Sequence, residues 1–379
     1  MDGVQRFGER LVSEVEVETL SELFASLRES IDHEDLRSTF GIPELDALLA
    51  PTQPQPRPAP PQQQQQQPGN AASSEVPWRP DPPQTQTPRE KPSQGGPILE
   101  LISPPTTQHP SPSGKTSILT LLTTLSILPS TLTSTPLHGQ SSTIILLDPL
   151  SHFSVPRLAT AMTTHIHSCL HASHTPLTPP LRTAITSLVT RSLSHLHIFR
   201  PQSWSALLAT LAELETYLLS PSHAHKHKSQ HRAVRALIVD DVDAFAWALR
   251  ASASSSENPL ANASARLTRH LVRLSRLLGC AVVVSARAVA MQGVYRAAMP
   301  VSWPKGVVVT RVAVRRVEVV RFAPGISVEE AGREAGERWE VVRRARFEVW
   351  RVGGRTEDGG EGFVFWVNDR GVGVERAGG

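Results

Sequence analysis

Short apolar segments recur along this chain, with helical patterns between them. The intervening stretches place leucines three and four residues apart, as in Leu207–Leu218, which is the spacing of one buried helix face. Strands that are apolar throughout are buried on both faces, and their alternation with helices favours a parallel sheet between two helical layers. The sequence therefore predicts an α/β fold with a mostly parallel central sheet. The strands are expected at Ile98–Ile102, Thr143–Leu147, Leu196–Phe199, Ala236–Asp240 and Cys280–Ser285.

The pattern changes after Gly306, where valine and arginine alternate. The segments VVVTRVAVRRVEVV, RFEVWRV and GFVFWVN combine β-branched and aromatic residues with charged ones in the two-residue period of a half-exposed strand. We expect these segments to form an antiparallel extension of the sheet at its C-terminal end.

The N-terminal quarter of the chain differs from the rest in composition. Residues 51–97 are dominated by Pro, Gln and Ser. Such a segment cannot bury enough apolar surface to offset its ordering entropy, so we predict a disordered insert. It would separate an N-terminal helical segment, residues 1–50, from a core at 98–379. Within the first segment, Leu20–Leu27 and Pro43–Leu49 show short amphipathic helical patterns.

Composition narrows the setting of the protein. Two cysteines, Cys169 and Cys280, are too few for a disulfide framework and fit a reducing compartment. The N-terminus is too polar for a signal peptide, and no apolar run is long enough to span a bilayer, so we expect a soluble protein without membrane contact. The net charge of +3 permits contact with nucleic acid but does not demand it.

A phosphate-binding pattern follows the first expected strand. Ser113-Gly114-Lys115-Thr116 opens the next helix, where backbone N–H groups and a lysine bind phosphate and a hydroxyl ligates Mg²⁺. Asp240 ends RALIVDD, where a carboxylate would hold the metal through water. The alternative is an ordinary helix start and an ordinary acidic strand end. The agreement of strand, loop, helix and later strand favours a site for ATP and Mg²⁺.

Several segments resemble the core of RecA-type recombinases in the same order along the chain. They are FGIPELDALLA, LDPLSHFSVPRL, RALIVDDVDAF, RLTRHLVRLSRLLGCAVVVSARAV and TRVAVRR. Asp148 followed by His152-Phe153, and Ile127-Leu128-Pro129, are similar to the X-ray repair cross-complementing branch of the eukaryotic recombinase paralogues. The resemblance covers residues 39–49 and most of 98–374. It implies a RecA-like P-loop core and a role in the nucleus, in repair of DNA double-strand breaks by homologous recombination.

The chain departs from the recombinase pattern where hydrolysis takes place. His109 stands at the first glycine of the loop, and Pro110 and Pro112 remove two N–H donors. Leu150 occupies the position of the glutamate that activates water and cannot act as a general base. Arg287 replaces a glutamine that senses the γ-phosphate. These departures imply weak or absent ATP hydrolysis, and they leave two alternatives for the site: a structural nucleotide, or relics that cap a helix and end a strand.

The resemblance also implies partners. Two loops would face DNA, of which the first, 250–265, nearly lacks positive charge. The second loop, 290–306, contains Tyr295, Arg296, Trp303 and Lys305. Aromatic rings of this kind stack on bases, and positive charges neutralise phosphate. Single-stranded or branched DNA is therefore one expected partner, and other recombinase paralogues are the other.

A histidine-rich helical stretch has the composition of a metal site. It contains His165, His167, Cys169, His171 and His174. On a helix, three of these histidines share a face without a carboxylate to orient them as ligands, which favours surface or packing roles over metal binding.

Three functions are compatible with the sequence. The leading hypothesis is a non-catalytic recombinase paralogue that docks on other paralogues and assists recombinase filament assembly on single-stranded DNA, with Phe40 as a candidate anchor. The second is a DNA-dependent ATPase in which Asp241 or Asp243 replaces the missing glutamate. The third is an unrelated P-loop-fold enzyme, such as a small-molecule kinase, although no motif for a second substrate is visible.

Overall fold

The computed structural model of the chain describes ten stretches of residues. The predicted helix over Leu20–Leu27 lies outside them, as does most of the predicted insert. Residues 95–97 lie inside them and lead into the first strand, where the Pro97 carbonyl accepts a hydrogen bond of 3.0 Å from the Val282 N–H. The described residues are 39–49, 95–103, 113–220, 228–252, 258–291, 294–297, 299, 302–317, 325–352 and 362–375.

The expected helix that starts at Pro43 is present, and so are helices between the predicted strands. Among the described helices, none combines the length and apolar character that a membrane crossing requires. The helices are α3 (Pro43–Leu49), α4 (Lys115–Ile127), α5 (Val155–Ala172), α6 (Pro179–Leu193), α7 (Trp204–Leu219), α8 (Ala246–Ala251), α9 (Pro259–Leu278) and α10 (Val328–Arg344).

The apolar runs expected as strands form β1, β4, β5, β6 and β7, so these predictions are confirmed. The strands are β1 (Ile98–Ser103), β2 (Thr131–Leu132), β3 (Thr135–Pro136), β4 (Thr143–Leu147), β5 (Leu196–Phe199), β6 (Val234–Val239), β7 (Ala281–Met291), β8 (Val294–Ala297), β9 (Val309–Arg316), β10 (Arg346–Arg351), β11 (Gly362–Asn368) and β12 (Gly371–Glu375).

The described residues form one ten-stranded sheet, with β2 and β3 paired separately. Its order is β12-β11-β10-β9-β1-β7-β6-β4-β5, and β8 pairs with β7. The strands from β9 to β5 run parallel, whereas β10, β11 and β12 are antiparallel to their neighbours. The expected antiparallel extension therefore begins one strand later than the sequence suggested: β9 pairs parallel with β1.

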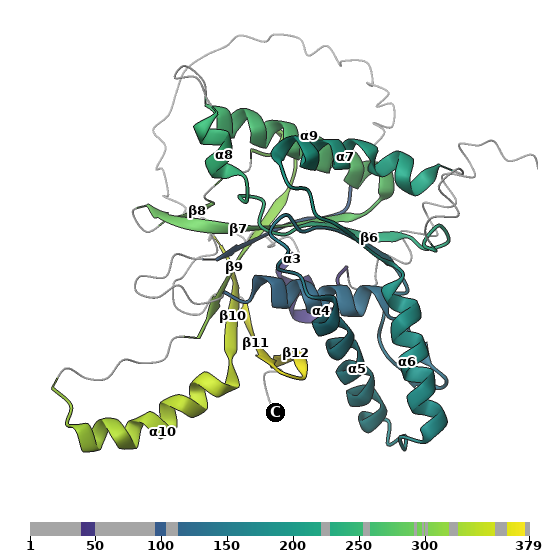
Figure 1. Cartoon of the computed structure of the whole chain (residues 1–379), viewed down its shortest axis with the longest axis vertical. Coiled ribbons are helices and arrows are strands. Elements are labelled where there is room, and N and C mark those ends of the chain that lie inside the picture. The colour runs from purple at the N-terminus through teal and green to yellow at the C-terminus, as the bar shows by residue number, and fades with distance from the viewer. Residues whose placement is uncertain are drawn as a thin grey trace, which may run out of the picture. The chain divides into compact units, whose positions relative to one another are not determined.

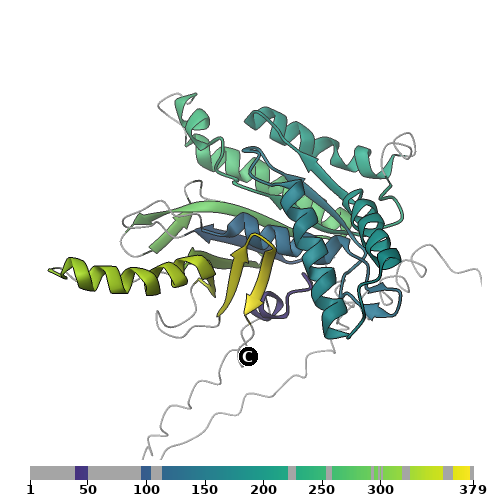
Figure 2. The ribbon, with the colours of Figure 1, turned by 60° about the horizontal axis from the view of Figure 1, so that its bottom comes forward.

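Helices cover both faces of the parallel part of the sheet. Figure 1 shows α4, α5 and α6 below the sheet and α7, α8 and α9 above it, and Figure 2 shows the two layers from another side. The pleat divides each strand between two apolar clusters: Leu99 and Leu101 of β1 pack with α4 to α6, whereas Ile98 packs with α7 and α9. The fold is thus a mixed α/β structure in three layers.

Residues 39–49, which include α3, pack into the core of the sheet and its helices. Phe40, Ile42, Leu45 and Leu48 are buried in the cluster below the sheet. The Phe40 N–H donates to the Asp46 carboxylate at 2.9 Å, which closes the turn into α3. Because the Phe40 ring is fully buried in its own chain, it is not exposed to anchor a neighbouring subunit, and that expectation was wrong.

Polar residues at the helix starts explain where several helices begin. Ser154 accepts from the Arg157 N–H before α5, Ser203 from the Ala206 N–H before α7, and Asn258 from the Ala261 N–H before α9. In contrast, the residue before α4 is Gly114, which has no side chain to serve as a cap. Its carbonyl accepts hydrogen bonds of 3.0 Å from the N–H groups of Ser117 and Ile118.

Two buried histidines lie at the start of β5, at the amino edge of the sheet. His195 Nδ1 and His197 Nε2 contact the same Ser229 hydroxyl, at 3.1 and 2.8 Å. Burial, reinforced by the nearby Arg232 charge, lowers the pKa of His195 to about 4. The neutral imidazole is thus part of the folded structure at neutral pH.

We expect the free energy of unfolding to fall as the pH drops from about 6.5 towards 4. In the unfolded chain His195 takes up a proton near its ordinary pKa of about 6.5, whereas in the folded protein its pKa is about 4. The unfolded state therefore binds more protons in this window, and one histidine adds a slope of up to about 1.4 kcal/mol per pH unit. Urea unfolding at several pH values measures the slope.

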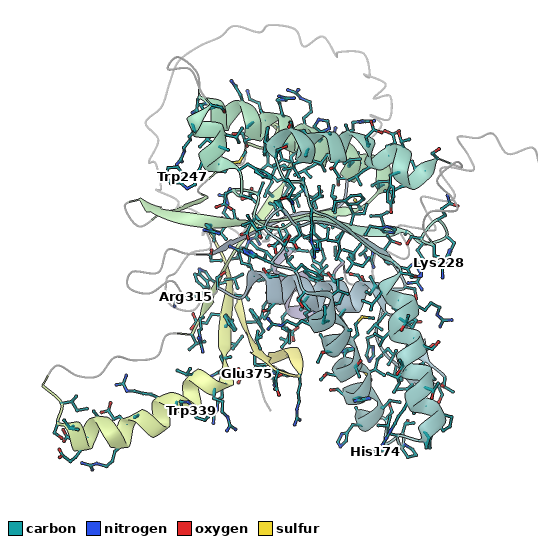
Figure 3. All side chains as sticks on the ribbon, in the orientation of Figure 1. His174, Lys228, Trp247, Arg315, Trp339 and Glu375 are labelled. Carbon is teal, nitrogen blue, oxygen red and sulfur yellow. The ribbon has the colours of Figure 1, made fainter. Side chains whose placement is uncertain are left out.

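Two substitutions make this pH test specific. His195→Gln cannot take up a proton and should reduce the slope, whereas His174→Gln, at an exposed histidine (Figure 3), should retain it. A slope that is equal in wild type and His195→Gln would show that His195 does not couple folding to pH.

Candidate functional site

The residues predicted to bind nucleotide and metal meet at the carboxyl edge of the parallel sheet. Residues 113–116 lead from β1 into α4, and Asp240 follows β6 directly. Strand β7 lies between β1 and β6 and runs parallel to both, so all three strands end at the same edge. Loops and helix starts at this edge are where open α/β sheets bind ligands.

Thr116 and Asp240 are joined by a hydrogen bond. The Thr116 hydroxyl donates to Asp240 Oδ2 at 3.0 Å, and the Ser285 hydroxyl donates to Oδ1 at 2.5 Å. Asp240 is 1% exposed. Burial and the neighbouring Asp241 charge raise the pKa of Asp240, while the two hydroxyl donors favour its ionised form. The carboxylate is thus fixed beside the first-turn threonine of α4.

Lys115 is buried at the same edge. Its Nζ donates to Ser103 Oγ and to the Ala286 carbonyl, each at 3.0 Å, and lies 3.7 Å from Asp241 Oδ1. Burial lowers the pKa of Lys115, and the nearby carboxylates, Asp241 first, act against that shift. Among the described residues, the Lys115 ammonium thus contacts one carboxylate and two neutral acceptors, and an incoming phosphate would compete with them.

Gly114 shapes the entry to α4. Its backbone is left-handed, with φ 86°, and its carbonyl accepts hydrogen bonds of 3.0 Å from the N–H groups of Ser117 and Ile118. A Cβ on Gly114 would lie 2.7 Å from Phe347 Cδ1 and 2.9 Å from Phe365 Cζ. Only glycine satisfies both the conformation and the packing, so β10 and β11 fix the position of this turn.

Asp241 contacts a histidine across the site. His152 Nδ1 lies 2.9 Å from Asp241 Oδ2, and the Asp241 N–H donates to the Ser285 hydroxyl at 2.8 Å. Asp241 has a positive φ of 55°, which is costly for a residue with a side chain. Ser285 therefore contacts both aspartates. Ser285 was not among the predicted site residues, although a serine that interrupts the apolar run of β7 near the sheet edge was a usable signal.

The spacing of Asp148 and His152-Phe153 has a physical basis in the turn after β4. The Asp148 carboxylate accepts hydrogen bonds from the N–H groups of His152 and Phe153, at 2.9 and 3.1 Å. Asp148 is 1% exposed, and Arg200 lies 3.8 Å from its Oδ2. The turn that presents His152 to Asp241 is therefore held by a buried carboxylate.

Two of the residues expected to weaken hydrolysis, Leu150 and Arg287, lie at this edge as well. Leu150 follows β4 and is 37% exposed. Arg287 is exposed and follows Ala286, whose carbonyl contacts Lys115. His109, Pro110 and Pro112 lie outside the described residues.

The structure describes the side chains of two of the four residues predicted to contact DNA, Trp303 and Lys305. Tyr295 and Arg296 lie in β8, beyond the end of the parallel strands, and their side chains lie outside the described ones. Trp303 is half-buried, and its indole N–H donates to Glu100 Oε1 at 2.5 Å. Lys305 is exposed. The Trp303 ring thus packs towards β1, which limits its use as a stacking platform.

The structure places His165, His167, Cys169 and His171 on α5, whereas His174 follows the end of the helix, with a positive φ of 51°. His167, His171 and His174 are exposed, whereas His165 Nε2 contacts the Leu137 carbonyl at 2.8 Å. Within the described part of the chain, no group of three or more His, Cys, Asp or Glu side chains could hold a metal ion. A hydroxyl and a carboxylate, as at Thr116 and Asp240, still fit Mg²⁺, which keeps most of its water and takes few protein oxygens.

The chemistry of this edge is that of an anion and cation site. The uncapped start of α4 and Lys115 attract negative charge, while Asp240 and the Thr116 hydroxyl offer oxygen ligands. Lys115, Thr116 and Asp240 could be identified from the sequence, and the structure adds Ser285, His152 and Asp148. In comparisons with known proteins, no family model and no curated protein matches this chain.

Proposed function

We propose that this chain is a RecA-like recombinase paralogue that binds ATP with Mg²⁺ without efficient turnover and acts as an adaptor in homologous recombination. It docks on other recombinase paralogues in the nucleus and assists recombinase filament assembly on single-stranded DNA. The observation that carries the proposal is the hydrogen bond of 3.0 Å between Thr116 and Asp240, which are 124 residues apart in the sequence. It joins the proposed phosphate loop to the proposed metal carboxylate.

The contacts at the site support nucleotide binding. The N–H groups at the start of α4 and the Lys115 ammonium would hold the phosphates. The Thr116 hydroxyl and the Asp240 carboxylate would hold Mg²⁺, directly and through water. The ion neutralises phosphate charge when it is bound. Ser285 keeps the Asp240 carboxylate in place through its hydrogen bond to Oδ1.

The same edge argues against efficient hydrolysis. Leu150 cannot accept a proton from water. Asp241 is engaged by His152 at 2.9 Å and by Lys115 at 3.7 Å, so its oxygens are already in use. A nucleotide that is bound but hardly consumed supports a structural role, and with the ordered recombinase-like segments it favours an adaptor over an enzyme.

One observation favours a DNA-dependent ATPase as the second candidate. Asp243 Oδ1 is buried and has no hydrogen-bond partner among the described residues. Burial raises the pKa of Asp243. A carboxylate with a raised pKa is a better general base at neutral pH. DNA-stimulated phosphate release that is lost in Asp243→Asn would favour this candidate over the adaptor.

Lys115→Ala is expected to weaken ATP binding while it leaves the partner complex intact. Loss of a buried ammonium from a phosphate site should reduce affinity about 100-fold, or about 2.7 kcal/mol. Titration with a fluorescent ATP analogue measures the affinity, and co-purification with tagged protein measures the complex. Lys228→Ala removes an exposed lysine and serves as the control. If the Lys115 substitution alone dissolves the complex, the nucleotide site is part of docking, and the separation of the two functions is wrong.

A further inference from the structure

Helix α10 is capped at its start by residues of its own segment. Ser327 and Glu330 make a capping box: the Ser327 hydroxyl accepts from the Glu330 N–H at 3.2 Å, and the Glu330 carboxylate accepts from the Ser327 N–H at 3.2 Å. The helix contacts β11 near its C-terminal end, and in both ribbon views it lies apart from the helices on the sheet faces (Figures 1 and 2). Most of its described side chains are consequently exposed.

One stripe of this helix is apolar and faces solvent. Val328 is 84% exposed, Trp339 is 61% exposed and Val342 is 41% exposed, and Ala335 between them is exposed too. Their spacings of seven, four and three residues keep them on one narrow side of an α-helix. Figure 3 shows Trp339 on α10. Exposed apolar side chains on one side of a helix, a tryptophan among them, are typical of an interaction site. We call these four residues the α10 stripe.

Two glycines lie beside the α10 stripe. Gly332 and Gly336 sit in the middle of the helix, where each costs about 1 kcal/mol relative to alanine. A Cβ built on either glycine meets no described atom within 4 Å, so packing within the described part of the chain does not require them. A helix surface without side chains allows another backbone to approach closely. The glycines thus indicate a helix partner.

Charges on the glycine side of the stripe select the orientation of that partner. Glu329 lies in the first turn and Arg343 in the last, where its guanidinium lies 5.6 Å from the centre of the Trp339 ring. A second α10 in parallel orientation would place like charges opposite one another. In antiparallel orientation, with Gly336 near the centre, Glu329 of each copy lies opposite Arg343 of the other. The same register places each Trp339 over the gap beside Gly332.

We propose that α10 pairs antiparallel with α10 of a second copy of this chain. The pairing buries both α10 stripes and forms two Glu329–Arg343 ion pairs. Each Trp339 ring packs on the helix surface beside Gly332 of the other copy, where no side chain stands in the way. A contact between two helices of this length is smaller than a standard interface, so the dimer forms at micromolar concentrations. The pairing does not rest on the proposed nucleotide or recombination function.

Sedimentation of the full chain from about 1 to about 100 µM tests the pairing, because weak interfaces of this size dissociate in that range. We expect a monomer–dimer equilibrium for the wild type. Trp339→Ser and Gly332→Leu should each weaken it at least tenfold. Leucine has a much higher helix propensity than glycine, so Gly332→Leu should keep or raise the helix content seen by circular dichroism. Loss of the dimer without loss of the fold separates pairing from stability.

Charge reversal tests the orientation. Arg343→Glu should weaken the dimer at low salt, and the double change Glu329→Arg with Arg343→Glu should restore it, because the antiparallel pairs are then opposite again. Arg333→Glu, on the other side of the helix from the stripe, is the matched control and should have no effect. A wild type that stays monomeric over the whole range overturns the proposal, even if a different protein is found on the stripe. A dimer that Arg343→Glu leaves unchanged overturns the antiparallel arrangement.

Discussion

Asp240→Asn is expected to abolish the Mg²⁺-dependent part of ATP binding while the protein stays folded. The substitution removes the negative charge that would hold the metal and keeps the size of the side chain. An affinity loss of about 100-fold, or about 2.7 kcal/mol, is expected in the presence of Mg²⁺. Without Mg²⁺, wild type and variant should bind ATP equally weakly.

The stability of Asp240→Asn should equal or exceed that of the wild type. Burial and the Asp241 charge already disfavour the ionised form of Asp240. The neutral amide avoids the cost of burying a charge beside Asp241, and its oxygen still accepts a hydrogen bond from Ser285. ATP titrations with and without Mg²⁺, together with urea unfolding, measure both effects. Asp369→Asn, at an exposed aspartate, is the control. Undiminished Mg²⁺-dependent binding in Asp240→Asn would show that Asp240 is only a strand terminus.

Gly114→Ala is expected to lower the free energy of unfolding by about 2–5 kcal/mol. The left-handed conformation at φ 86° costs alanine about 1–2 kcal/mol. The new methyl group would also lie 2.7 Å from Phe347 and 2.9 Å from Phe365, so two buried rings must move. Overpacking of this kind costs about 1–3 kcal/mol. ATP binding should weaken as well, because the displaced turn carries Lys115 and Thr116.

A second glycine supplies the matched control for this loss. Gly279, after α9, is left-handed with φ 61°, and a Cβ built on it meets no described atom within 4 Å. Gly279→Ala should therefore lose only the conformational part, about 1–2 kcal/mol. Urea unfolding of both variants compares them directly. Equal losses at the two positions would mean that the aromatic rings of β10 and β11 do not hold the Gly114 turn.

The central strands could be predicted because their sequences are apolar on both faces. The runs at β1, β4, β5, β6 and β7 admit few other structures at that length. The partner of β9 could not be predicted from its pattern, because alternation in TRVAVRR reports a half-exposed strand and not its direction. Helix α10 was missed because Gly332 and Gly336 interrupt its pattern and Glu and Arg dominate the rest.

The candidate site was predictable where one motif carried it and not where it depended on distant contacts. Ser113–Thr116 and Asp240 follow strands directly, and parallel strands bring their carboxyl ends to one edge. The contact of Trp303 with Glu100 spans 203 residues, so an indole expected to stack on bases was found to pack towards β1. The contact between His152 and Asp241 could not be predicted either, because the two residues are 89 positions apart in the sequence.

Purification of the tagged protein from its own cells, with and without DNA damage, tests the adaptor role most directly. Mass spectrometry of the recovered complex identifies the partners and their amounts. The account predicts other recombinase paralogues in near-stoichiometric amounts, retained in the Lys115→Ala variant. Recovery of none of them with a well-folded bait would contradict the proposed function.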